Sequence, residues 1–166
     1  MGGDIAKKIG GDHVKVTSVI ASLSQDPHEY EVTAADQLKV RGAKLILENG
    51  GGYDAFFGDL VAKSGGSSAP VVTAVTFAPT WPKGEAGMKT VEGFNEHVWY
   101  DTAVVDGVAK KVAEELSGIA PAHKADFEKN LATFEKGLDG LNASLATIKG
   151  AHQARRSSSP SRSRCT

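Results

Sequence analysis

The sequence contains a single cysteine, Cys165, one residue from its end. One thiol excludes an intrachain disulfide and a metal cage built from thiolates. No apolar run approaches the roughly 18 residues that a membrane span requires. The first residues, MGGDIAKKIGG, lack the apolar core of a secretion signal. We therefore expect the chain as given to remain in the cytosol of an expressing cell.

Common catalytic motifs are also missing. No Gly-x-Ser-x-Gly segment provides the nucleophile of a serine hydrolase, and Cys165 lies too near the end of the chain to serve as a thiol nucleophile. The glycine run in ENGGGYDAFFGDL is not followed by Gly-Lys-Ser/Thr, so a phosphate-binding P-loop is not supported. The sequence thus favours a binding protein over an enzyme.

Positive charge is scarce before residue 154. That part carries 15 Lys and Arg against 20 Asp and Glu, a net charge of −5, while four arginines follow it. A negative body argues against nucleic-acid binding. The final segment QARRSSSPSRSRCT, from residue 153, has no aliphatic residue larger than alanine, and we interpret residues 153–166 as a disordered Arg/Ser tail. Such a tail is compatible with RNA binding or phosphorylation, but we favour a frameshift or cloning scar.

Helical and strand patterns alternate along residues 4–118. Strands are predicted at 14–20, 44–49 and 69–78, and helices at 4–9, 34–43, 54–64 and 102–118. Thr33 with Asp36 forms a capping-box pattern, and Asp101 is placed to cap the helix at 102. This alternation predicts an α/β fold with a mostly parallel sheet flanked by helices.

A long helix is predicted after Pro121. Apolar residues recur at alternating spacings of four and three: Phe127, Leu131, Phe134, Leu138, Leu141, Leu145 and Ile148. A helix over 121–149 is roughly 43 Å long at 1.5 Å per residue. This length exceeds what a small α/β domain needs, and it is typical of a connection to a second body.

The five histidines are the candidate metal ligands. His13, His123 and His152 are most simply solvated surface residues. His28, in SQDPHEYEVTAAD, and His97, in NEHVWYD, fall in loops beyond strand ends, where α/β sheets usually build sites. The carboxylates around His28 are expected to orient imidazoles and to cap helices.

Four segments carry a family resemblance: GDIAKKIGGDHVKVTSVI, DPHEYEVTAADQLKV, AKLILENGGGYDAFF and NEHVWYD. Over residues 3–152 the chain resembles the zinc- or manganese-specific substrate-binding proteins of ABC transporters. The resemblance implies two lobes joined by a long helix, with the metal between them and His28 and His97 as the ligands of the first lobe. It also implies an ABC permease as partner and an extracellular, membrane-anchored or periplasmic location for the intact family member. Neutral imidazole suits Zn²⁺ or Mn²⁺.

The resemblance is incomplete. The first strand, the His-rich loop before the second histidine and the whole second lobe are missing, and the other two ligands with it. We expect residues 3–120 to form the metal-binding lobe and 121–150 the connecting helix, with the second lobe absent. Two ligands should bind zinc several powers of ten more weakly than an intact relative.

Two other functions stay open at this point. One is an interaction or adhesion fragment that self-associates through residues 138–149, as a homo-oligomer without transport activity. The other is a small metallohydrolase using His28 and His97, although no third ligand or general base is evident.

Overall fold

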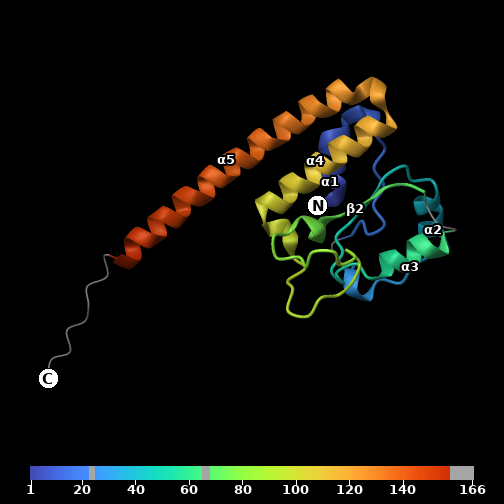
Figure 1. Cartoon of the computed structure of the whole chain (residues 1–166), viewed down its shortest axis with the longest axis horizontal. Helices are drawn as coiled ribbons and strands as arrows, with labels where there is room; N and C mark the ends of the chain where they lie inside the picture. The colour runs from blue at the N-terminus through green and yellow to red at the C-terminus, as the bar shows by residue number, and fades with distance from the viewer. Residues whose placement is uncertain (23–24, 65–67, 158–166) are drawn as a thin grey trace.

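A small parallel sheet flanked by helices forms the body of the protein, and one helix extends far beyond it (Figure 1). The computed structural model describes residues 1–22, 25–64 and 68–157, with side chains up to residue 151. The α-helices are α1 (Gly2–Gly10), α2 (Ala34–Arg41), α3 (Phe56–Lys63), α4 (Thr102–Ile119) and α5 (Lys124–Ser157). The strands are β1 (Ile46–Glu48) and β2 (Val71–Thr73). Short 3-10 turns are η1 (Gly11–His13), η2 (Pro27–Glu29), η3 (Ala74–Phe77), η4 (Val98–Tyr100) and η5 (Pro121–His123).

The sheet is parallel, as the alternation of helices and strands predicts. β1 pairs with β2, with Ile46 opposite Val71, and α3 forms the crossover between them. The expected α/β class is therefore confirmed. Each strand has only three residues, so the lobe contains much more helix than sheet.

The predicted helix caps are present. Thr33 and Asp36 form a complete capping box at the start of α2. The Asp101 side chain accepts a hydrogen bond of 2.9 Å from the backbone N–H of Ala103 at the start of α4. Both caps satisfy N–H groups that have no partner within the helix.

The strand predicted at 14–20 is wrong. Those residues have no regular secondary structure, although Val14 is in the extended region. An alternating sequence forms a strand only when another strand pairs with it, and among the described residues β1 pairs only with β2. Segment 14–20 instead lines one side of a groove of 1470 Å³, with Leu47 and Glu48 of β1 also in its wall.

The main core joins α1, α4, β2 and the start of α5. Its buried residues include Ile9, Val75, Val104, Val112 and Phe127, none of which exposes any surface. A smaller cluster under α2 and α3 contains Val40, Ile46 and Leu60. The apolar residues of α4 recur at helical spacing, which explains why this helix is the one buried most extensively.

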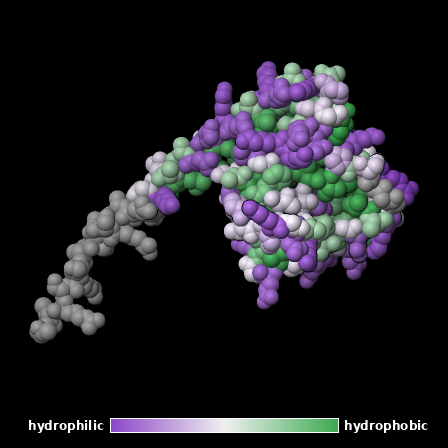
Figure 2. Space-filling model, viewed as in Figure 1, coloured by the Kyte–Doolittle hydropathy of each residue, from purple (hydrophilic) through white to green (hydrophobic). Residues whose placement is uncertain are grey.

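Helix α5 is anchored at one end and projects at the other (Figures 1 and 2). Its 34 residues span about 51 Å at 1.5 Å per residue. Phe127 is buried and Leu131 and Phe134 pack on the core, whereas Leu141, Leu145 and Ile148 are 48%, 49% and 57% exposed. The apolar stripe predicted from the sequence is thus covered only in its first half.

The end of the chain is described only in part. α5 continues to Ser157, so residues 153–157 of the tail predicted over 153–166 are helical, and residues 158–166 lie outside the described residues. Within the described ranges, no helix combines the length and apolar character needed to cross a bilayer.

Candidate metal site

His28 is held by the turn η2. Pro27 fixes the backbone at the first position of this turn, and the Asp26 carboxylate accepts a hydrogen bond of 2.9 Å from the backbone N–H of His28. The Asp26 carboxylate therefore caps the turn, and the exposed imidazole of His28 remains free for other contacts.

His97 lies just before η4 and is oriented by Asn95. The Asn95 side-chain oxygen accepts from the backbone N–H of His97 at 3.1 Å and lies 2.9 Å from the imidazole Nδ1. An amide oxygen can only accept, so Nδ1 carries the proton and donates to it. When the ring is neutral, Nε2 keeps a free lone pair, the arrangement that metal-binding histidines use.

Tyr53 contacts both histidines. Its ring centroid lies 5.2 Å from that of His28 and 5.8 Å from that of His97, with an edge-on arrangement in both cases. Trp99 lies against Tyr53 at 4.8 Å and against His97 at 5.0 Å. The structure thus brings His28 and His97, 69 residues apart in the sequence, around one tyrosine.

The glycine run after β1 positions Tyr53. Gly50, Gly51 and Gly52 have φ values of 79°, 66° and 94°, a region that residues with a side chain rarely adopt. Asp54 closes the turn, because its carboxylate accepts from the backbone N–H groups of Asn49 and Gly50 at 2.7 and 2.8 Å. These glycines form a tight turn; they do not form a phosphate loop.

Asn49 connects this turn to the loop of His97. The side chain is 7% exposed, and its Nδ2 donates to the carbonyl oxygen of Glu96 at 2.9 Å. This bond links the end of β1 to the residue directly before His97. Asn49, Tyr53, Asn95 and Trp99 were not among the candidates predicted from the sequence, although Asn95 and Trp99 each lie two residues from His97 in the NEHVWYD segment.

The surroundings of Tyr53 are negatively charged. Burial raises the pKa of the Tyr53 hydroxyl, and the carboxylates of Asp54, Asp26 and Glu96 raise it further. Tyr53 is therefore a neutral phenol at physiological pH. The same carboxylates make the surroundings of Tyr53 negative, which favours a cation near it.

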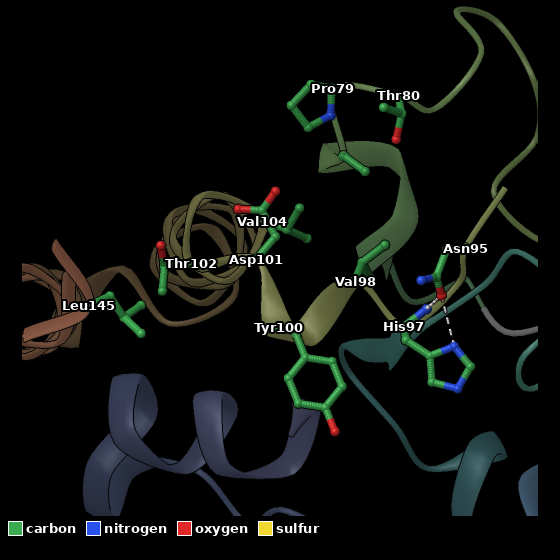
Figure 3. A pocket seen from close by; sticks show the side chains of 11 residues that line it. Pro79, Thr80, Asn95, His97, Val98, Tyr100, Asp101, Thr102, Val104 and Leu145 are labelled. Carbon is green, nitrogen blue, oxygen red and sulfur yellow. Dashed lines mark hydrogen bonds between the residues drawn. The ribbon is translucent and has the colours of Figure 1, made fainter. Parts of the chain in front are cut away.

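An open hollow of 540 Å³ lies next to the His97 loop and is lined by His97, Asn95 and Leu145, among others (Figure 3). In Figure 3, His97 and Asn95 lie at one side of it and Leu145 of α5 at the other. The Thr102 hydroxyl also donates to the Asn142 side-chain oxygen at 2.7 Å. Helix α5 therefore passes next to the His97 loop before it leaves the body.

Asp36, one of the carboxylates near His28 in the sequence, is engaged at the start of α2. Asp36 is buried and accepts hydrogen bonds from Tyr30, Thr33 and Lys39. Burial alone would raise the pKa of the Asp36 carboxyl, but these hydrogen bonds hold it well below its usual range. Asp36 therefore stabilises the start of α2, in agreement with the expectation that some of these acids cap helices.

His13 is exposed and His123 is partly exposed, and the two side chains lie next to each other. His13 and His123 stack with their ring centroids 3.8 Å apart, and His13 also contacts Asp126. The side chain of His152 lies outside the described part of the chain.

Comparisons with known proteins agree with this architecture. Residues 1–158 match the model of the ZnuA family, described as zinc-uptake complex component A, periplasmic, and the chain belongs to this family. The manganese-binding lipoprotein MntA of Bacillus subtilis is 31% identical over 141 residues, covering 84% of this chain and 44% of the relative. The manganese ABC transporter substrate-binding lipoprotein PsaA of Streptococcus mitis is 32% identical over 151 residues, covering 84% and 46%.

Solved structures show the same fold. The periplasmic zinc-binding protein TroA of Treponema pallidum superposes with a TM-score of 0.71 at 28% identity, covering 86% of this chain and 50% of that one. The Fe(III)-bound YtgA of Chlamydia trachomatis gives a TM-score of 0.67 at 26% identity, covering 85% and 48%. This chain spans about half the length of the relatives that it matches.

Proposed function

We propose that this chain is the N-terminal lobe and connecting helix of a substrate-binding protein for a divalent first-row metal, Zn²⁺ or Mn²⁺. Residues 3–120 form the lobe and residues 121–150 the connecting helix in this proposal. The observation that supports it best is the contact of His28 and His97 with the same Tyr53 ring, together with the Asn95 bond that leaves His97 Nε2 free. The metal is cargo that is bound and released, and no catalytic step is involved.

His28 and His97 would supply two nitrogen ligands. Zinc prefers four ligands and manganese a mixed nitrogen and oxygen set, so water or groups from outside this chain complete the shell. Binding by two protein ligands is weak, because most of the free energy of metal binding comes from several preplaced ligands acting together. We expect zinc affinity several powers of ten below that of a two-lobed relative.

The whole protein would deliver its metal to an ABC permease from outside the cytoplasmic membrane. The relatives MntA and PsaA are lipoproteins by name, and TroA is named periplasmic. These names support the proposal of a location outside the cytoplasmic membrane, anchored or periplasmic, for the whole protein. The negative potential around Tyr53 fits a site that collects cations.

The test is a zinc titration followed by NMR of the histidine ring nitrogens. We expect the His28 and His97 signals to move together, and His28→Ala to abolish the change at His97. Glu29→Ala, an exposed neighbour in the same turn η2, is the matched control and should bind as the unaltered chain does. Independent responses of the two rings, or none in the presence of millimolar zinc, would contradict a shared metal.

Self-association is a second part of the proposal. Leu141, Leu145 and Ile148 lie at spacings of four and three on the projecting half of α5 and are about half exposed. Burying one such side chain is worth roughly 1.5–3 kcal/mol, and the spacing suits pairing of two helices. We expect the isolated chain to form a dimer or a higher oligomer through residues 138–149.

Light scattering coupled to gel filtration, at micromolar concentration with a chelator present, measures the mass directly. An oligomer that persists with chelator and dissociates in Leu145→Glu supports pairing through α5. A single species at the monomer mass of 17.3 kDa would show that this surface stays unpaired.

A further inference from the structure

A second group of potential metal ligands lies where α1 meets the start of α5. It consists of His13 in η1, His123 in η5 and Asp126 in the first turn of α5, and one ligand atom of each lies within 4.8 Å of the other two. His13 Nε2 is 3.0 Å from an Asp126 carboxylate oxygen. The two imidazoles stack with an interplanar angle of 18°. His123 and Asp126, three residues apart at the start of α5, thus lie next to His13, which comes 110 positions before His123.

The backbone on both sides of this group is well supported. Phe127 exposes no surface and contacts the rings of His13 and His123 edge-on at 5.9 and 6.4 Å. The Asn130 side chain donates to the carbonyl oxygen of Ile9 at 2.9 Å, which ties α5 to the end of α1. The ligand-bearing turns are therefore fixed relative to each other before any metal binds, which lowers the cost of ordering them.

The separations suit a first-row cation after a small adjustment. Zinc lies 2.0–2.2 Å from nitrogen and oxygen ligands, so ligand atoms in a tetrahedral site are about 3.3 Å apart. Reaching this value from 4.8 Å requires the side chains to rotate, and the His13 and Asp126 side chains are 32% and 57% exposed. Two imidazoles and one carboxylate leave a position open for water, as in zinc sites with three protein ligands.

The hydrogen bond between His13 and Asp126 holds the two ligand groups 3.0 Å apart, and a cation that binds both would replace this hydrogen bond. When a cation binds, it takes the lone pair of Nε2, and the ring proton moves to Nδ1 or is released to solvent. The Asp126 carboxylate offsets one of the two positive charges of the cation.

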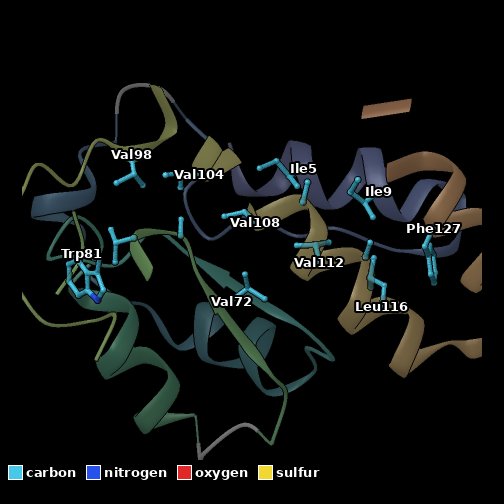
Figure 4. Close-up of a cluster of buried hydrophobic side chains, with 14 residues drawn as sticks. Ile5, Ile9, Val72, Trp81, Val98, Val104, Val108, Val112, Leu116 and Phe127 are labelled. Atoms are coloured by element: carbon cyan, nitrogen blue, oxygen red, sulfur yellow. The ribbon is translucent and has the colours of Figure 1, made fainter. Parts of the chain in front are cut away.

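This group is distant from the site at His28 and His97. Figure 4 shows Val98, the neighbour of His97, near one end of the main core and Phe127, the neighbour of Asp126, at the other. One ion cannot contact both sets of ligands.

We propose that His13, His123 and Asp126 form a second binding site for a divalent first-row cation of the zinc class. A cation there links η1 to the base of α5. Since a ligand that binds only the folded state stabilises it, zinc should raise the melting temperature even when the first site has been removed.

The experiment uses the full chain carrying His28→Ala and His97→Ala, so its outcome does not depend on the function proposed above. Zinc is titrated while the ring signals of His13 and His123 and the melting temperature are followed. We expect both rings to respond with one zinc per chain. His123→Ala should lower the zinc affinity at least tenfold, since removing even a residue that only supports a metal ligand commonly costs tenfold or more in affinity. His123→Ala leaves the His13–Asp126 hydrogen bond in place. A lower zinc affinity in this variant therefore distinguishes a three-ligand metal site from a His–Asp pair alone.

Two further variants complete the design. Asp126→Asn preserves the shape of the side chain and should also weaken zinc binding at least tenfold, by the same reasoning. Asp12→Asn changes an exposed carboxylate next to His13 and is the matched control, with unchanged affinity expected. Circular dichroism confirms folding. No response of the two rings to millimolar zinc, or equal affinity in His123→Ala and its parent, would overturn the proposal.

Discussion

Replacing Glu48 by glutamine should make the protein more stable in alkaline solution and leave it unchanged in acid. Glu48 ends β1, and its carboxyl accepts a hydrogen bond of 2.6 Å from the Thr73 hydroxyl. Burial raises the pKa of Glu48 to about 7 from an ordinary value of 4.5; the Thr73 bond opposes this shift, and the nearby charge of Asp54 adds to it. The carboxyl is thus largely protonated in the folded protein below neutral pH.

The sign of the pH dependence follows from the raised pKa. The unfolded chain ionises near pH 4.5 and the folded one near 7, so the contribution of Glu48 to stability is complete below pH 4.5 and is lost as the pH rises to 7. Each unit of difference between the pKa of Glu48 in the unfolded and the folded protein is worth about 1.4 kcal/mol of stability. The loss is no more than about 3 kcal/mol, because the side chain keeps partial contact with water.

Urea unfolding at pH 5 and pH 8 measures the effect. The amide of Glu48→Gln resembles the protonated acid and can still accept from Thr73, so the variant should gain about 2–3 kcal/mol at pH 8 and little at pH 5. The exposed Glu31→Gln is the control and should follow the unaltered chain at both values. An equal difference at pH 5 and pH 8 would refute the reasoning, since it would not arise from ionisation.

Three other substitutions have defined outcomes. Phe127→Ala removes a fully buried ring and should lower the unfolding free energy by about 3–5 kcal/mol in chemical denaturation. Asp36→Asn weakens the hydrogen bonds from Tyr30, Thr33 and Lys39 and should lower the unfolding free energy by about 2–3 kcal/mol at pH 7. Because the pKa of Asp36 lies below its usual value in the folded protein, this loss should shrink as the pH falls below 4. A loss that does not depend on pH would contradict this. Asn95→Ala removes the acceptor for His97 Nδ1 and should weaken zinc binding about tenfold with a nearly unchanged melting temperature, whereas Asn95→Asp should restore it.

Local features of the fold could be predicted from the sequence. The capping box of Thr33 and Asp36 and the cap at Asp101 depend on residues two or three apart, and all are present. The long helix after Pro121 follows equally from its own apolar spacing. The strand at 14–20 failed because a strand requires a paired neighbour, which an alternating pattern does not supply.

The candidate site also combines features that could be predicted from local sequence with features that depend on distant contacts. His28 and His97 could be proposed from the sequence because each belongs to a short motif, and the structure places both against Tyr53. The group at His13, His123 and Asp126 was missed, because it exists only when the end of α1 packs on the start of α5. Contacts across more than a hundred residues have no local signal in one sequence.

Anomalous X-ray scattering at the zinc absorption edge, from crystals of the chain grown with zinc, tests most directly whether His28 and His97 hold one metal ion together. We expect a peak about 2.0–2.1 Å from a ring nitrogen of both histidines, with Nε2 as the ligand atom of His97. Zinc peaks that contact only one of the two, or a pair of imidazoles too far apart to share an ion, would contradict it.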